Sequence, residues 1–94
     1  MIELLLYSRS YCHLCDDMHA AVMVHRDQVA FDLQVIDVDA DPALVAVYDE
    51  LVPVLAARKA DGAILKICHH FLDQGALLAY FDGEKAKAVG APAS

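Results

Sequence analysis

Positive charge is scarce in this sequence of 94 residues. Seven Lys and Arg stand against 14 Asp and Glu, so the formal net charge is -7 with the histidines neutral. Such a surplus of negative charge repels the phosphates of nucleic acids and the anionic headgroups of membranes. We therefore expect neither a nucleic acid nor a membrane surface as a partner.

Long hydrophobic runs are missing as well. No stretch approaches the roughly 18 consecutive apolar residues that a transmembrane helix requires. The first residues, MIELLLYSR, form an apolar stretch too short for a signal peptide, and Glu3 stands where a basic region would be expected. The sequence therefore predicts a cytoplasmic protein.

Glycine and proline are few, with four and three residues. Hydrophobic residues make up 59% of the sequence and charged residues 22%, a composition that excludes an intrinsically disordered chain. A chain of this length usually forms one domain, which buries only about two thirds of its unfolded surface. We expect one domain at residues 1–82, a frayed Ala-rich tail at residues 83–94, and a monomer.

Cysteine occurs three times, at Cys12, Cys15 and Cys68. A small secreted domain that depends on disulfides usually contains an even number of cysteines. An odd number therefore predicts reduced thiols as the ordinary state. The close pair in the segment SYCHLC needs a chemical explanation.

The spacing of apolar residues predicts strands and helices in alternation. A continuous apolar run is typical of a strand covered on both faces, and apolar residues three or four positions apart indicate an amphipathic helix. Asp41, which precedes Pro42, and Asp73 are suited to begin helices, and Asp61-Gly62 is a turn signal. The predicted elements are a strand at Ile2–Ser8, a helix at His13–Val29, a strand at Phe31–Ala40, a helix from Pro42 to about Glu50, an antiparallel hairpin of Val54–Ala57 with Ala63–Cys68, and a helix at Asp73–Phe81.

This element order, β-α-β-α-β-β-α, predicts an α/β fold. A first β-α-β unit with a right-handed crossover, followed by an antiparallel hairpin, gives one mixed four-stranded sheet with helices on both faces. In the last helix, Leu77, Leu78 and Phe81 are available for the core.

The pair in CHLC lies where the first strand is expected to run into a helix. Cys12 would then sit beside the unpaired N–H groups and the positive end of the helix dipole, so it should ionise more easily than a free thiol. Cys15, one helical turn later, is close enough to attack a mixed disulfide formed at Cys12. The alternative is that both cysteines are small core residues, since free cysteine is often buried.

Four segments of the chain resemble the glutaredoxin-like family of the thioredoxin fold: YSRSYCHLC, IDVDADPAL, LVPVL and FLDQGALLAYF. The resemblance spans roughly residues 2–81 and implies a thioredoxin-like three-layer sandwich. It also implies a thiol-disulfide oxidoreductase that cycles between a dithiol and a Cys12 to Cys15 disulfide. No metal or organic cofactor is implied, the substrates would be protein or small-molecule disulfides, and glutathione is a candidate reductant.

The resemblance also assigns a substrate site. It implies a cis peptide bond at Pro53, at the start of the third strand and facing the cysteines. The backbone of Val52 would then lie beside Cys12 and offer a docking edge to a peptide or to glutathione. Asp73 is implied as the group that receives the amino end of the ligand, although a helix N-cap explains it equally well.

The chain departs from the glutathione-binding members of that family at two places. Those members usually carry Pro-Tyr between the cysteines and a Gly-Gly pair with a nearby Asp after the fourth strand. This chain has His13-Leu14 and the segment CHHFLD at these positions. The departures argue against specificity for glutathione.

Side chains near the cysteines are further candidates for the substrate site. Arg9 could stabilise the thiolate or bind a ligand carboxylate, Tyr11 could pack beside the sulfur, and His13 could lower the pKa of the thiol. Arg9 could equally be solvated, and Tyr11 could cover the edge of the sheet. Asp16 and Asp17 complement the helix dipole, but they would oppose thiolate formation.

Two other functions fit the same residues. Cys12, Cys15 and Cys68, with His69 or His70, match the ligand set of tetrahedral zinc, although structural zinc sites more often consist of two closely spaced pairs. A thioredoxin-like domain can also bind a partner while its dithiol stays idle, because a fold does not fix a function. Cys68 could itself be a third redox-active thiol if it points towards Cys12.

Overall fold

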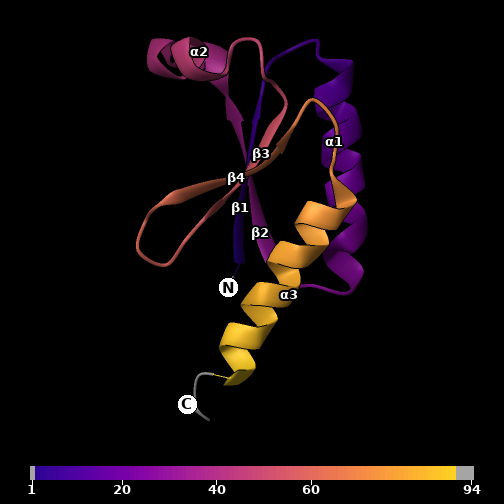
Figure 1. Ribbon diagram of the computed structural model, residues 1–94. Helices are drawn as coiled ribbons and strands as arrows, with labels where there is room; N and C mark the ends of the chain where they lie inside the picture. The colour runs from indigo at the N-terminus through magenta and orange to yellow at the C-terminus, as the bar shows by residue number, and fades with distance from the viewer. Residues whose placement is uncertain (1, 91–94) are drawn as a thin grey trace.

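One mixed sheet of four strands organises the molecule (Figure 1). The computed structural model describes the backbone of residues 2–90 and the side chains of residues 2–85. The strand order is β2-β1-β3-β4, in which β1 pairs parallel with β2 and the other neighbours are antiparallel. The strands are β1 (Ile2–Ser8), β2 (Phe31–Asp37), β3 (Val54–Arg58) and β4 (Ile64–His69).

Helices cover both faces of this sheet. The helices α1 (His13–Met23) and α3 (Gln74–Gly90) lie on one face, and α2 (Pro42–Tyr48) lies on the other (Figure 1). Short 3-10 helices follow α1 and β2, namely η1 (Val24–Asp27) and η2 (Val38–Ala40). The predicted order of elements and the three-layer thioredoxin-like sandwich are thereby confirmed. Within the described residues, no helix combines the length and apolar character needed to cross a bilayer.

The apolar run of β1 is explained by burial on both faces of the sheet. Leu4 and Leu6 belong to the core against α1 and α3, whereas Leu5 and Tyr7 belong to the core against α2. Successive side chains of a strand point to opposite faces, so a strand in the middle of a covered sheet needs apolar residues at every position. The next strand in the sheet, β3, alternates between the two cores in the same way.

Two elements end earlier than the sequence predicts. The regular helix α1 ends at Met23, and the chain continues as a 3-10 helix instead of reaching Val29. The strand β2 ends at Asp37 because the carboxylate of Asp37 accepts a hydrogen bond from the N–H of Asp39, at 3.0 Å, and begins η2. Residues up to 40 therefore form a turn of helix where a strand was expected.

The last helix differs from the prediction in its length and in one core residue. Leu77 and Phe81 are buried as expected, but Leu78 is 46% exposed because the neighbouring face of α3 points to solvent. The helix also continues to Gly90, past the predicted end at Phe81. Residues 91–94 of the predicted tail lie outside the described residues, and the domain boundary at residue 82 stays a prediction.

Phe81 should be a major source of stability. Its ring is 1% exposed and stacks on Phe31 with ring centroids 5.7 Å apart. We predict that Phe81→Ala lowers the free energy of unfolding of the oxidised protein by about 3 to 5 kcal/mol, measured by urea titration. The control is Phe71→Ala, because Phe71 is 69% exposed and its removal should change stability by about 0.5 kcal/mol or less. Equal losses in the two variants would contradict this assignment of the core.

Candidate active site

A disulfide joins Cys12 and Cys15 at the start of α1. Cys12 is the N-cap residue, and its Sγ accepts a hydrogen bond from the N–H of Cys15 at 3.1 Å. Cys12 is half-buried, whereas Cys15 is only 3% exposed. The pair therefore consists of one sulfur near the surface and one behind it, as thiol-disulfide exchange with an external partner requires.

The two residues that flank Cys12 point away from the core. Tyr11 has a φ of 57°, a left-handed conformation that is uncommon for a residue with a bulky side chain, and its side chain is fully exposed. His13, the first residue of α1, is also exposed. Both side chains are thus available to a molecule that approaches Cys12, and their role in substrate binding stays a prediction.

The segment that begins β3 lies at the same end of the sheet as the disulfide. β1 and β3 are antiparallel neighbours, and Tyr7, near the end of β1, pairs with Val54. The peptide bond between Val52 and Pro53 is cis, and Pro53 is buried. The N–H of Val52 donates a hydrogen bond to the carbonyl of Tyr48 at 3.1 Å. The backbone N–H of the predicted docking edge is therefore already bonded within the protein.

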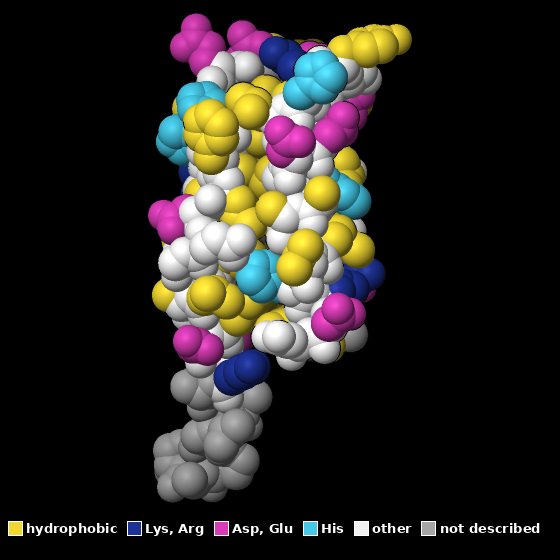
Figure 2. Space-filling view, turned by 90° about the vertical axis from the view of Figure 1, so that its right-hand side faces the viewer, with side chains coloured by type: hydrophobic (Ala, Val, Ile, Leu, Met, Phe, Trp, Pro, Cys, Tyr) yellow, Lys and Arg dark blue, Asp and Glu magenta, His cyan; other side chains and the backbone are white. Residues whose placement is uncertain are grey.

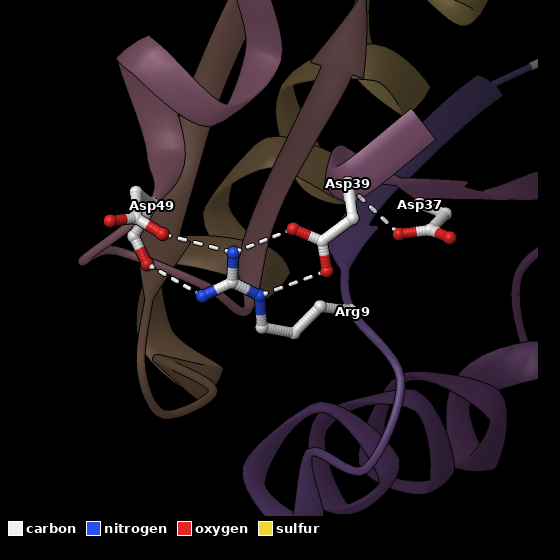
Figure 3. Close-up of polar contacts among 4 residues, drawn as sticks. All are labelled: Arg9, Asp37, Asp39 and Asp49. Carbon is white, nitrogen blue, oxygen red and sulfur yellow. Dashed lines mark hydrogen bonds and ion pairs between the residues drawn. The ribbon is translucent and has the colours of Figure 1, made fainter. Parts of the chain in front are cut away.

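Arg9 binds two carboxylates and does not extend freely into solvent (Figure 3). Its Nη2 donates to Asp39 at 2.8 Å and to Asp49 at 2.9 Å, its Nε donates to Asp39 at 3.3 Å, and its Nη1 donates to the carbonyl of Asp49 at 3.4 Å. The hydrogen bonds that Arg9 donates to Asp39 and then to Asp49 raise the pKa of its guanidinium. Arg9 thus ties the loop before Cys12 to η2 and to the end of α2.

The role of Asp39 and Asp49 is not apparent from the sequence. They lie 30 and 40 residues from Arg9 along the chain, among many other acidic residues that could have paired with it. The described polar contacts of Arg9 all lead to these two residues. A contact of Arg9 with a substrate carboxylate therefore stays a prediction and would have to compete with two existing partners.

Asp73 begins α3 and also faces Cys68. Its carboxylate accepts the N–H of Ala76 at 3.0 Å, which is the hydrogen bond expected of an N-cap. Burial raises the pKa of the Cys68 thiol, a hydrogen bond from the backbone of Asp73 opposes this rise, and the negative charge of Asp73 adds to it. The predicted helix cap is confirmed, and the predicted ligand contact of Asp73 is not tested by these bonds.

His69 ends β4, and His70, which follows it, supports the neighbouring loops. The backbone N–H of His70 donates a hydrogen bond to the carbonyl of Pro53 at 2.8 Å. The Nε2 atom of the His70 ring is hydrogen-bonded to the carbonyl of Glu50 at 2.7 Å. Its Nδ1 lies 3.3 Å from Nδ1 of His69. Among residues 2–85, no three His, Cys, Asp or Glu side chains gather into a group that could hold a metal ion. The zinc ligand set considered above is therefore not brought together in the described part of the chain.

A wide hollow of about 640 Å³ lies at the opposite end of the sheet. Its lining includes Glu3 and Arg58, which form an ion pair at 3.4 Å. Burial and then a hydrogen bond with Glu84 raise the pKa of the nearby Tyr80 to about 12. No cysteine lines this hollow, so it is separate from the candidate active site.

A three-layer sandwich with a C-x-x-C pair at the start of its first helix defines a thioredoxin-fold protein. The chain belongs to the family described as "Glutaredoxin-like domain (DUF836)", whose family model matches residues 3–82. No significant match is found among functionally curated proteins.

Solved structures agree with this assignment. The solution NMR structure of protein Ne2328 from Nitrosomonas europaea is 36% identical, with a TM-score of 0.75 over 85% of this chain and 91% of that chain. The X-ray structure of protein XcR50 from X. campestris is 34% identical, with a TM-score of 0.56 over 85% of this chain and 96% of that chain. Oxidised mitochondrial thioredoxin 3 from Saccharomyces cerevisiae, at 18% identity and a TM-score of 0.63 over 87% of this chain and 77% of that chain, shares the fold.

The Arg9 ion pairs should contribute to stability in a salt-dependent way. We predict that Arg9→Gln lowers the midpoint of thermal unfolding more than Arg58→Gln, because Arg58 makes one long ion pair and Arg9 makes two short ones. The difference should shrink as salt is added, since salt screens exposed charges. Equal midpoints in the two variants at low ionic strength would show that the ion pairs of Arg9 contribute no more than the single ion pair of Arg58.

Cys68 should react more slowly in the folded protein than a free thiol does. A raised pKa leaves less thiolate at a given pH, and the thiolate is the reactive form. In a variant with Cys12→Ser and Cys15→Ser, we predict that alkylation of Cys68 requires a higher pH in the folded protein than in the same protein unfolded in urea. Identical pH profiles in the two states would contradict the effect of burial.

Proposed function

We propose that the protein is a thiol-disulfide oxidoreductase that uses Cys12 and Cys15. The observation that carries the proposal is the disulfide at the start of α1, in which Sγ of the half-buried residue Cys12 accepts a hydrogen bond from the N–H of Cys15. The N–H of Cys15 belongs to the first turn of α1, where an N–H has no partner within the helix, and we expect it to stay beside Cys12 after reduction. It can therefore stabilise a negative charge on the same sulfur.

The proposed reaction transfers two electrons from the protein to a substrate disulfide. The Cys12 thiolate attacks one sulfur of the substrate, which forms a mixed disulfide and releases the other sulfur as a thiolate that takes up a proton. Cys15 then loses its proton and attacks Sγ of Cys12, which forms the intramolecular disulfide and releases the second substrate thiol. An external thiol, for which glutathione is one candidate, restores the dithiol by the reverse exchange.

The surroundings of Cys12 act in opposite directions on its thiolate. The positive end of the α1 dipole and the N–H of Cys15 favour it. The carboxylates of Asp16 and Asp17, both exposed in the first turns of α1, disfavour it. Water screens the charges of these exposed carboxylates more strongly than it weakens the hydrogen bond from the N–H of Cys15. We therefore expect the start of α1 to have the larger effect on the pKa of Cys12.

Substrates would be recognised mainly by backbone and exposed side chains around the disulfide. We place Val52, the cis Pro53, Tyr11 and His13 along the path of a disulfide-containing peptide. Arg9 would act mainly by positioning the loop before Cys12. Asp73 remains a proposed contact for an amino group, and the cytoplasmic location remains a prediction from the sequence.

The test uses the full chain and hydroxyethyl disulfide, a small uncharged substrate, with thiol release measured after chemical reduction of the protein. The reduced protein should convert the substrate, and Cys12→Ser should abolish this conversion. Cys15→Ser should instead accumulate a mixed disulfide on Cys12, detectable by mass spectrometry.

Cys68→Ala is the matched control, because Cys68 is the free cysteine of the described chain and takes no part in the proposed exchange. It should keep the activity of the unmodified protein. Absence of conversion by the reduced protein would instead favour a binding domain with an idle dithiol. Equal activity of Cys12→Ser and Cys68→Ala would also overturn the proposal.

A further inference from the structure

An apolar groove of about 150 Å³ lies between α1 and the loop that follows β4. On α1 it is lined by Leu14, which lies between the two cysteines in sequence, and further along the helix by Met18. On the loop it is lined by Phe71 and Leu72. The groove therefore begins at the C-x-x-C segment itself.

Large apolar side chains are left exposed at this groove. Phe71 is 69% exposed and Leu14 is 38% exposed, although both belong to segments held in place by the disulfide and by the hydrogen bonds of His70. Figure 2 shows this face of the molecule, with hydrophobic side chains at the surface and acidic side chains close to them. Exposed aromatic and aliphatic residues at a groove are typical of protein contact surfaces.

The negative charge of the protein is concentrated around the same end of the sheet. This end, which we call the disulfide end, comprises the start of α1, the end of β2 with η2, both ends of α2, and the start of α3. Its acidic residues are Asp16, Asp17, Asp37, Asp39, Asp41, Asp49, Glu50 and Asp73. Asp17 is itself part of the groove lining.

Basic residues do little to offset this charge. Among residues 2–85, Arg9 is the one Lys or Arg in the loops of the disulfide end, and Asp39 and Asp49 already bind it. The ammonium of Lys66 lies 5.4 Å from the ring of Tyr48, at the end of α2, and therefore on the face of the sheet opposite to the groove. The remaining described Lys and Arg belong to η1, β3, the hairpin turn and α3, and are Arg26, Arg58, Lys59 and Lys85.

We propose that the apolar groove beside the disulfide docks a basic polypeptide segment, one with an apolar side chain next to its disulfide cysteine and Lys or Arg around it. The proposal rests on the redox function proposed above and specifies its substrate class. The groove accounts for the apolar side chain, and charge complementarity selects the cationic surroundings. An anionic disulfide would meet the repulsion of the same carboxylates.

The test compares two peptide disulfides of equal length, each with Leu beside one cysteine and flanked by either Lys or Glu. Pre-reduced full-length protein is mixed with each peptide or with hydroxyethyl disulfide, and thiol release is followed by chromatography after acid quenching. We expect the Lys peptide to react at least about tenfold faster than the Glu peptide at low ionic strength. The ratio should fall as salt is added, because both partners are exposed charges.

Single substitutions separate the contribution of the apolar groove from the contribution of the negative charge. Phe71→Ser should lower the rate with the Lys peptide relative to hydroxyethyl disulfide. Leu78→Ser, at an exposed apolar residue of α3 outside the groove lining, should leave that ratio unchanged. Asp17→Asn should reduce the preference for Lys over Glu without removing the effect of the groove.

The outcomes of this experiment are distinguishable. Equal rates for the two peptides, a faster Glu peptide, or equal effects of Phe71→Ser and Leu78→Ser would overturn the inference. In each of these cases reduction of hydroxyethyl disulfide would leave the redox function standing. Failure to reduce any of the three substrates would overturn the redox function, and the inference with it.

Discussion

The proposed chemistry of this protein depends on the hydrogen bond that the N–H of Cys15 donates to Sγ of Cys12. The first N–H groups of a helix have no partner within the helix, and here one of them faces a sulfur atom. The same geometry sets the two cysteines apart, because Cys12 lies near the surface at the N-cap and Cys15 is buried inside the first turn. An asymmetric pair of this kind can present one sulfur to a partner and keep the other as an internal nucleophile.

This arrangement is held in place from several directions. The strand before the pair is buried on both faces, so the end of β1 has little freedom to move. Arg9 then fixes the connecting loop through Asp39 and Asp49 on the opposite side of the sheet from α1. The carboxylates that hold Arg9 also belong to the acidic disulfide end. The residues that position the cysteines therefore contribute to the electric field that a substrate meets.

Most of the fold could be predicted because its signals are local in the sequence. The apolar run of β1 and the turn at residues 61–62 depend on residues close to one another, and both led to the correct elements. The ion pairs of Arg9 could not be predicted, because Asp39 and Asp49 are distant in sequence and compete with many other carboxylates. The spacing of apolar residues likewise places Leu14 on the apolar face of α1. It does not show how much of that face other elements cover, and Leu14 is left 38% exposed. The groove lies where the covered part of this helix face ends.

The most direct test is alkylation of the fully reduced protein across a pH series, with the modified cysteines identified by mass spectrometry. The account predicts that Cys12 reacts first and selectively, with a half-maximal rate at a pH well below the value of about 8.5 at which a free thiol ionises. A half-maximal rate for Cys12 at or above that pH, or equal reactivity of all three cysteines, would contradict the proposed stabilisation of its thiolate by the start of α1.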